Sequence, residues 1–445
     1  MTFKTFPGGV HPPDQKARTS QKGTETAPLP SEVVCPMSQH IGAPCEPIVK
    51  VGDQVKTGQV IGQSKAFVSA PVHAPVSGKV TSVGPAPHPL GRPLTAVTIE
   101  SDGQDLWDEN IKEDPYYQKL ESREILDRIR NAGIVGLGGA AFPTAVKLSP
   151  PKGKTIDTVI INGVECEPYL TADHRIMLEE PEKIISGLRL IMNVLNVERA
   201  FVGIEANKPD AIQAISDAVK NDPQISVQGL RLKYPQGAEK QLIKAILGRE
   251  VPPPPGLPMD VGVVVQNAGT CVAIHEAVKE RKPLVERVMT ITGSGVKEPR
   301  NLRVRLGMRF SDLIELCGGI EDPLGKVIMG GPMMGIAQHS LDVPVIKGTS
   351  GILLLSRKDA LKIQSKACIR CGLCVRACPM NLLPNLLGVY CEKGRWEEAE
   401  EHRILDCMEC GSCSYICPAR RQMVHLIKLG KQEIMNIKKK AEVTS

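Results

Sequence analysis

Residues 368–379, CIRCGLCVRACP, and residues 407–418, CMECGSCSYICP, decide how the carboxyl-terminal part of this chain folds. Each stretch has the spacing Cys-x2-Cys-x2-Cys-x3-Cys-Pro. A cubane iron–sulfur cluster needs four thiolates at tetrahedral corners, and three cysteines at two-residue gaps wrap one tight loop around three irons. The fourth cysteine, beside a proline, leaves the loop and ligates the other cluster. The spacing therefore predicts two [4Fe–4S] clusters.

This crossed arrangement predicts the ligands of each cluster. One set is Cys368, Cys371, Cys374 and Cys417, and the other is Cys407, Cys410, Cys413 and Cys378. The alternative is zinc, with each four-cysteine run closing on itself. Zinc ribbons usually pair two Cys-x2-Cys knuckles across a longer gap, so the spacing favours iron–sulfur clusters.

The segment between the two stretches predicts a helix from Pro384 to His402. Its apolar positions are Leu386, Leu387, Tyr390, Trp396 and Ala399. We expect Cys391, within this segment, to be a buried thiol and not a ligand. The module looks like the helical ferredoxins of respiratory and anaerobic reductases.

Length and composition limit what the rest of the chain can be. The 445 residues are too many for one compact core, and the 42% hydrophobic content is that of a globular protein. The 14 cysteines indicate thiols, metal ligands or redox centres. A formal net charge of +6 and 3% aromatic residues argue against a nucleic-acid groove. We expect no membrane-spanning helix and, from residues 1–13, no export signal.

Upstream of the cysteines, the pattern predicts an α/β domain. A helix ending near Gly133 precedes the glycine-rich stretch GLGGAAFPTAVK at 136–147, where backbone N–H groups and Lys147 suit a phosphate. A plain glycine turn is the alternative, because a dinucleotide fingerprint follows a strand and not a helix. Strands are predicted at 158–162 and 200–204, and helices at 181–195 and 208–220. Alternation of this kind is typical of α/β folds.

Four separated motifs carry a resemblance to known proteins. GLGGAAFPTAVK, INGVECEP at 161–168, KYPQGAEKQLI at 233–243 and VVVQNAGT at 263–270 resemble the flavin and NADH site of the 51-kDa-type subunit of respiratory complex I. With GGVHPP at 8–13 and the cysteine repeats, the chain resembles over its full length the C subunit of the Rnf complex. That family is a membrane-associated, ion-translocating ferredoxin:NAD oxidoreductase.

The resemblance implies which residues bind the flavin and the nucleotide. The FMN positions would be Gly136, Gly138, Gly139, Lys147, Asn162, Glu165, Asn267 and Thr270. The NADH positions would be Phe142, Glu167, Tyr234, Gly237 and Glu239. The complex I patterns Gly-Glu-Glu and Asn-x-Asp-Glu lose one acid each, at Ala238 and Val164. No side chain need act as a catalytic acid or base. Cys166 is expected to be a packed thiol, with a redox role as the alternative.

The resemblance also implies four domains and a tail. A barrel-sandwich similar to biotinyl and lipoyl carriers, but unmodified, would cover 1–110, the FMN/NADH α/β domain 111–284, a soluble-ligand-binding β-grasp (SLBB) module 285–356 and the two-cluster ferredoxin domain 357–425. Residues 426–445 form a basic tail, either a solvated helix end or a docking segment for an anionic membrane or acidic partner.

Together these features predict a peripheral electron-input subunit on the cytoplasmic face of a membrane. Electrons would pass between NADH/NAD, FMN, the two clusters and a ferredoxin-type iron–sulfur subunit of the Rnf complex. A flavin-less wire and the cobalamin reductase of bacterial microcompartments are the alternatives. Quinone reduction is disfavoured, because related quinone-linked subunits lack the cluster repeats.

Overall fold

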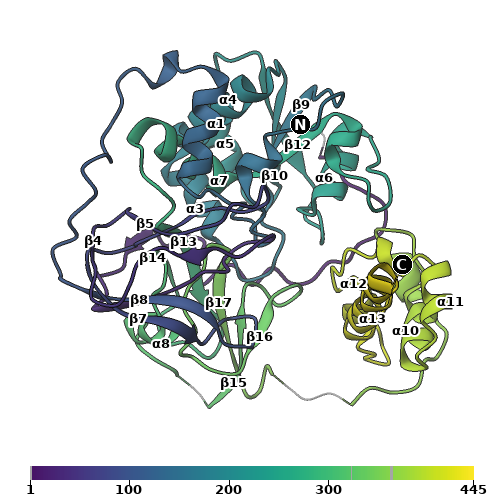
Figure 1. The fold of residues 1–445 in the computed structure, drawn as a ribbon. Helices are drawn as coiled ribbons and strands as arrows, with labels where there is room; N and C mark the ends of the chain where they lie inside the picture. Colours follow the sequence, from purple (N-terminus) through teal and green to yellow (C-terminus); the bar gives the residue numbers. More distant parts are fainter. Residues whose placement is uncertain (1–2, 322, 361–363, 445) are drawn as a thin grey trace.

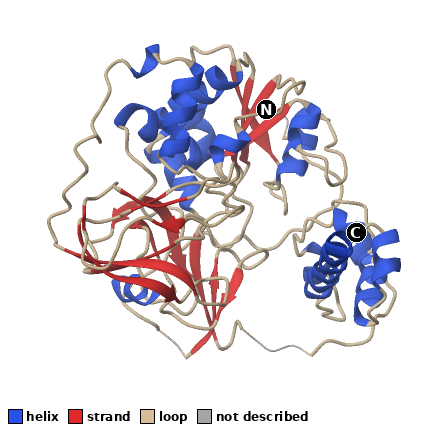
Figure 2. Cartoon of the chain, in the orientation of Figure 1, coloured by secondary structure: helices blue, strands red, loops and turns tan. Residues whose placement is uncertain are grey.

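The computed structural model describes residues 3–321, 323–360 and 364–444. In Figure 1 an α/β part lies above a β-rich part, and a helical module at the carboxyl terminus lies to one side. Figure 2 shows that strands dominate the lower part, whereas the carboxyl-terminal module consists of helices and loops. Both cysteine stretches belong to that helical module.

The barrel-sandwich is built from short antiparallel strands. They are β2 (Glu32–Pro36), β3 (Glu46–Pro47), β4 (Gln54–Val55), β5 (Val60–Gln63), β6 (Val72–His73), β7 (Gly78–Ala86) and β8 (Leu94–Ser101). The two sheets are ordered β2-β8-β7-β4 and β3-β5-β6. Alternate residues such as Val33 and Cys35 of β2 enter one shared core, because successive side chains of a strand point to opposite faces.

The α/β part contains one parallel sheet. Its strands are β9 (Thr158–Gly163), β10 (Ala200–Glu205), β11 (Ile225–Leu230) and β12 (Val263–Asn267), in the order β11-β10-β9-β12. Its helices are α1 (Ser122–Asn131), α2 (Thr144–Lys147), α3 (Ala172–Glu179), α4 (Pro181–Leu195), α5 (Pro209–Ala218), α6 (Glu239–Leu247) and α7 (Ala268–His275). The predicted strands and helices are confirmed.

Helices cover both faces of this sheet, which explains its nearly continuous apolar strands. Val159 and Ile161 of β9 join a core with α4 and α7, while Ile160 faces α6 on the other side. Because both faces are buried, the carboxyl edge of the sheet is where polar side chains can gather.

The β-grasp module forms a six-stranded sheet. Its elements are β13 (Glu286–Thr292), β14 (Arg300–Arg305), α8 (Phe310–Leu316), β15 (Leu324–Met329), β16 (Ile336–Gln338), β17 (Gly351–Ser356) and, from the amino-terminal segment, β1 (Thr24–Thr26). The order is β1-β14-β13-β17-β15-β16. Residues before β2 therefore lie outside the barrel and extend across other parts of the chain.

The ferredoxin module corrects one prediction. Its helices are α9 (Leu373–Ala377), α10 (Pro384–Glu392), α11 (Trp396–Glu401), α12 (Ser412–Tyr415) and α13 (Met423–Thr444). The single helix predicted for 384–402 is wrong, because the chain turns at Gly394, whose φ is +65°, and forms α10 and α11. Folding back lets both helices pack against α13. Cys391 is buried in the resulting apolar core, as predicted.

The basic tail continues α13, which crosses the boundary placed at 425/426. Its lysines are partly paired within the module: Lys431 contacts Glu409 at 2.6 Å, and Lys438 contacts Glu400. Among the helices of the described residues, none has the length and apolar content needed to cross a bilayer.

Candidate functional site

The carboxyl edge of the parallel sheet brings two predicted flavin residues side by side. Asn162 at the end of β9 is in register with Asn267 at the end of β12. The chain order reverses between these strands, and α/β proteins bind ligands in the crevice at such a point. The Asn162 Nδ2 donates to the Gly237 carbonyl at 2.7 Å, which adds a third predicted residue to this edge.

The glycine loop lies over the same edge. Gly138 and Gly139 are exposed, and a Cβ on Gly138 would be 3.5 Å from the Asn267 Cβ. The Leu137 N–H donates to the Thr270 Oγ1 at 2.9 Å, so α7 anchors the loop. Asn267 caps α7 by accepting the Thr270 N–H at 3.3 Å. An open backbone loop, two amides and a helix start fit the phosphate and ribityl chain of a flavin mononucleotide.

Two further predicted residues form an ion pair beside the loop. Lys147, at the end of α2, contacts Glu239, at the start of α6, at 2.5 Å. Both side chains are partly exposed, so the pair can open toward a ligand. The Phe142 carbonyl accepts the Gly136 N–H at 2.9 Å and closes the glycine loop.

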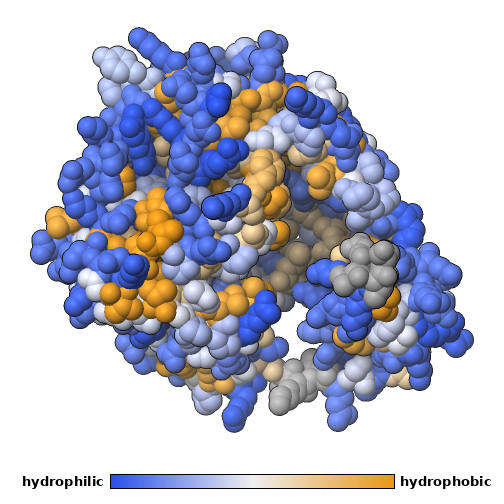
Figure 3. Space-filling model, in the orientation of Figure 1, coloured by the Kyte–Doolittle hydropathy of each residue, from blue (hydrophilic) through white to orange (hydrophobic). Residues whose placement is uncertain are grey.

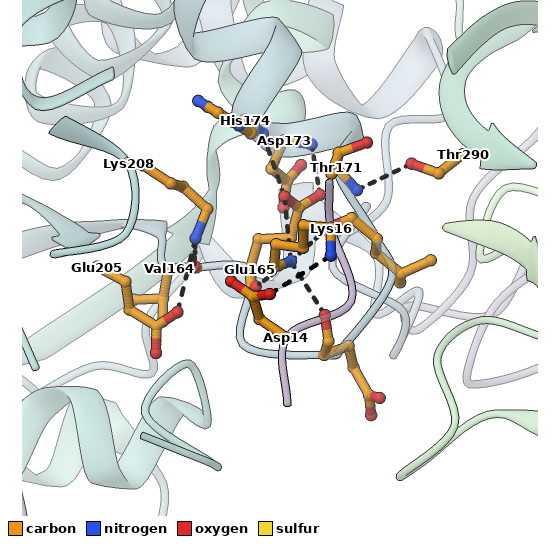
Figure 4. Close-up of polar contacts among 12 residues, drawn as sticks. Asp14, Lys16, Val164, Glu165, Thr171, Asp173, His174, Glu205, Lys208 and Thr290 are labelled. Carbon is orange, nitrogen blue, oxygen red and sulfur yellow. Dashed lines mark hydrogen bonds and ion pairs between the residues drawn. The ribbon is translucent and has the colours of Figure 1, made fainter. Parts of the chain in front are cut away.

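Glu165 is buried inside a charged network beneath the INGVECEP loop (Figure 4). Its carboxylate accepts the backbone N–H groups of Asp173 at 2.7 Å and His174 at 3.3 Å, which holds the start of α3. Lys16, from the amino-terminal segment, lies 3.7 Å from the same carboxylate. Its Nζ also donates to the carbonyls of Glu165 at 2.9 Å and Glu167 at 3.0 Å, and to that of Leu170.

Other buried groups complete this network. The Lys208 Nζ donates to the Val164 carbonyl at 2.7 Å and pairs with Glu205 at 3.5 Å. The Asp173 carboxylate accepts from the Asn267 Nδ2 at 2.6 Å. Burial and the neighbouring Glu165 raise the pKa of Asp173 above its ordinary value. The backbone of the loop is therefore fixed by two lysines from outside it.

The predicted nucleotide residues Glu167 and Tyr234 reach from this network to the β-grasp module and the ferredoxin module, respectively. The Glu167 carboxylate accepts the N–H groups of Met333 at 3.0 Å and Met334 at 2.9 Å. Burial raises its pKa, so its environment is not that of a solvated surface carboxylate. The Tyr234 hydroxyl donates to the Cys410 carbonyl at 2.7 Å. Burial raises the pKa of the neighbouring Cys166 thiol, as for a packed thiol.

The eight repeat cysteines surround two hollows. Cys368, Cys371, Cys374 and Cys417 line one, which we call the outer site, and Cys368 and Cys371 are exposed. Cys378, Cys407, Cys410 and Cys413 line the other, the inner site, where all but Cys407 are buried. Four sulfur donors per hollow is the ligand number of a cubane cluster.

Burial also affects two thiols of the inner site. It raises the pKa of Cys407 to about 11 and that of Cys413 to about 12. Metal ligands of this type are thiolates, so cluster binding would replace these protons. The donor chemistry therefore fits iron–sulfur clusters.

Sequence reasoning missed the residues that support the site. Lys16, Lys208, Asp173 and Arg287 belong to no motif, and a lone lysine or arginine in a sequence is usually exposed. Arg287, on β13, donates to the Leu137 carbonyl at 3.1 Å and so reaches the glycine loop from another domain. Only the fold brings these charges together.

Family models match four successive parts of the chain. They are the RnfC barrel sandwich hybrid domain at 4–104, the Nuo51 FMN-binding domain at 129–276, the SLBB domain at 288–337 and a 4Fe-4S dicluster domain at 360–418. The chain is 52% identical, over 97% of its length and 94% of the relative, to the C subunit of the proton-translocating ferredoxin:NAD(+) oxidoreductase complex of Clostridium ljungdahlii.

The chain belongs to the RnfC family. It is also 49% identical to the C subunit of the Na(+)-translocating ferredoxin:NAD(+) oxidoreductase complex of Acetobacterium woodii, over 98% of each chain. An NAD+-reducing [NiFe]-hydrogenase chain shares the fold, with a TM-score of 0.50 and 18% identity over 72% of this chain and 65% of that one. The predicted RnfC resemblance and the predicted four-part architecture are confirmed.

Proposed function

We propose that this RnfC protein is the electron-input subunit of an ion-translocating ferredoxin:NAD oxidoreductase. Electrons pass between NADH/NAD, FMN and two [4Fe–4S] clusters, in a direction set by the nucleotide and ferredoxin pools. The relatives named as C subunits of such complexes and the matching flavin and dicluster models support this assignment.

One contact carries the proposal: the inner site adjoins the α/β domain. Tyr234 donates its hydroxyl to the Cys410 carbonyl at 2.7 Å, and Val10, Tyr234, Ala377 and Cys410 form one buried cluster. A subunit that receives electrons in pairs and passes them on singly requires a flavin site and a cluster site close to each other on the same chain. When bound, FMN takes two electrons as a hydride and gives them up singly to iron–sulfur clusters.

The chain's own residues bind and orient these groups. Gly138 and Gly139 offer backbone N–H groups to the FMN phosphate, with Lys147 as the countercharge. Gly136 shapes the loop around the phosphate through its hydrogen bond to the Phe142 carbonyl. Asn162, Asn267 and Thr270 fix the flavin at the sheet edge, and Glu165 holds the loop around it through α3. Phe142, Glu167, Tyr234, Gly237 and Glu239 form the NADH side. No residue needs to transfer a proton to the substrate.

The exposure of the two cysteine sites suggests their order. The inner site, ligated by Cys378, Cys407, Cys410 and Cys413, faces the flavin pocket. The outer site, ligated by Cys368, Cys371, Cys374 and Cys417, has two exposed cysteines and beside them Ile369, which is 67% exposed. We assign the outer site to exchange with a ferredoxin-type iron–sulfur subunit.

Membrane attachment would come from partners. Other Rnf subunits would carry out ion movement, and this chain would sit peripherally on the cytoplasmic face. The largely hydrophilic face of the ferredoxin module visible in Figure 3 suits contact with another protein better than insertion into lipid.

Anaerobic reconstitution with iron, sulfide and FMN tests the proposal. We expect bound FMN, about eight irons per chain, and reduction of both flavin and clusters when NADH is added, followed by optical and EPR spectroscopy. A protein that binds its full iron content but no flavin would support only the alternative of an electron-transfer subunit without flavin. Flavin reduction with no cluster reduction would break the assigned chain of carriers.

A further inference from the structure

Residues 4–22, which we call the strap, join parts of the molecule that are far apart in sequence. The Lys4 N–H donates to the Gly229 carbonyl at 3.1 Å, beside β11. The Asp14 carbonyl accepts the Tyr169 N–H at 2.8 Å, and the Lys22 Nζ donates to the Pro299 carbonyl at 2.8 Å. Between these anchors, the purple chain in Figure 1 passes the ferredoxin module. The strap therefore touches the α/β domain, the β-grasp module and the inner site.

The strap meets the inner site and the nucleotide side at adjacent residues. The Gly9 N–H donates to the Ala377 carbonyl at 2.9 Å, one residue before the ligand Cys378. Val10 and Tyr234 exchange two backbone hydrogen bonds, at 2.8 and 2.9 Å. The same short segment thus hydrogen-bonds to the cluster loop and to the residue that contacts Cys410.

Two glycines make this close approach possible. Gly8 and Gly9 have φ values of +79° and +82°, which disfavour other residues. A Cβ on Gly8 would lie 3.0 Å from the Cys378 carbonyl oxygen, and one on Gly9 would lie 2.6 Å from the Tyr234 carbonyl oxygen. Any side chain would push the cluster loop and the α/β domain apart. The GGVHPP motif thereby gains a physical role.

The strap matters because the ferredoxin module has open space on other sides, between it and the rest of the molecule. Figure 3 shows a gap between the ferredoxin module and the β-rich part. On the α/β side, Pro7, α6 and residues 379–383 line a hollow of about 450 Å³. The strap and the Tyr234 contact lie where the module touches the α/β domain. A shift of the module at this point would change the separation of flavin and inner site directly.

We propose that the strap is a positioning element for electron transfer, in which Gly8 and Gly9 set the distance between the flavin pocket and the inner cluster site. This inference rests on the proposed function, since it concerns the step that follows flavin reduction. The two glycines are not among the residues assigned to FMN or NADH. They act through the backbone of Cys378 and Tyr234.

The test compares three glycine-to-alanine variants of the reconstituted protein. Gly8→Ala and Gly9→Ala place a methyl group against the Cys378 and Tyr234 carbonyls. Gly91→Ala is the matched control, because Gly91 has a φ of +85° and a Cβ there would meet no atom within 4 Å. Stopped-flow absorbance follows flavin reduction by NADH, and rapid-freeze EPR follows cluster reduction. Hydrogen exchange of residues 374–380 reports the position of the loop without any turnover.

We expect Gly8→Ala and Gly91→Ala to keep flavin reduction at the wild-type rate, and Gly9→Ala, whose methyl group presses on Tyr234, to slow flavin reduction less than cluster reduction. Cluster reduction should slow several-fold in Gly9→Ala, because the rate of electron transfer falls exponentially as the distance between donor and acceptor grows, and exchange at 374–380 should accelerate. Gly91→Ala should match wild type in every measurement. If Gly9→Ala does not fold, the milder Gly8→Ala decides the question.

Equal cluster reduction in Gly9→Ala and Gly91→Ala would overturn the proposal, as would equal slowing of the flavin and cluster steps. Failure of the wild-type flavin to be reduced by NADH would sink the proposed function instead. Hydrogen exchange would still test the role of the strap in that case. Faster exchange of residues 374–380 in Gly8→Ala and Gly9→Ala would support a positioning role, and unchanged exchange would refute it.

Discussion

Replacing Lys16 by methionine tests whether a residue outside the flavin domain shapes the flavin site. Methionine keeps the length and apolar stem of lysine but loses its charge and its donors. Lys16 is 5% exposed, and its ammonium group bonds three loop carbonyls and pairs with Glu165. We expect Lys16→Met to weaken FMN binding by at least about 100-fold and to destabilise the α/β domain.

The magnitude follows from what the substitution leaves behind. Removing one partner of a buried ion pair costs about 3–5 kcal/mol, because the other charge stays buried without compensation. Bound FMN requires the ordered loop, so a variant that must re-form the loop on binding loses affinity. Since about 1.4 kcal/mol corresponds to tenfold in Kd, even 3 kcal/mol of this cost gives roughly 100-fold.

Flavin fluorescence titration of the apo-flavin protein measures Kd, and thermal unfolding reports stability. Lys65→Met is the matched control, because Lys65 is exposed in the barrel-sandwich. The double variant Lys16→Met/Glu165→Gln should lose less than the sum of the single variants, since the glutamine removes the uncompensated charge. FMN affinity within threefold of wild type in Lys16→Met, with an unchanged Tm, would refute the reasoning.

Three further predictions address other parts of the molecule. Burial lowers the pKa of Lys347 to about 7, from its ordinary value of 10.5. Between these two pH values the unfolded chain binds one proton more than the folded chain, so the free energy of unfolding should rise with pH by at most about 1.4 kcal/mol per pH unit. Lys347→Met should flatten the corresponding rise in Tm. Cys391→Ala should retain about eight irons, whereas Cys378→Ala should keep about four and lose one EPR signal; equal iron loss in both would contradict the ligand assignment. Glu239→Gln, which breaks the partly exposed pair with Lys147, should raise the KM for NADH about tenfold and leave Tm nearly unchanged; an unaltered KM would remove Glu239 from the nucleotide side.

The sequence predicted the elements of the α/β domain well, because their local signals agree with their burial. Pro181 and Asn196 bound α4, and the β-branched run of β9 is buried on both faces, as its composition indicates. The same reasoning failed between 384 and 402. Helical periodicity continues through Gly394, but packing of α10 and α11 on α13 favours a turn there, and periodicity alone carries no information about that packing.

The motifs identified candidate residues of the nucleotide site but not what those residues contact in the fold. Glu167 and Tyr234 are in motifs of the nucleotide site, yet the structure directs them to Met333 and Cys410 across domain boundaries. Lys16 gave no comparable signal, since its partners lie more than 100 residues away in the chain. The GGVHPP motif contributed to the resemblance but did not indicate what Gly9 contacts.

By itself the sequence predicted eight cysteines as cluster ligands, the glycine loop and the order of the modules, because ligand spacing, turn residues and strand periodicity are local properties of the chain. The tertiary structure alone decided which cysteine site adjoins the α/β domain, which lysines hold the INGVECEP loop and which atoms the amino-terminal glycines approach. These features depend on long-range contacts, because the energetic effect of a buried charge or of a missing Cβ is set by the atoms that the fold places next to it.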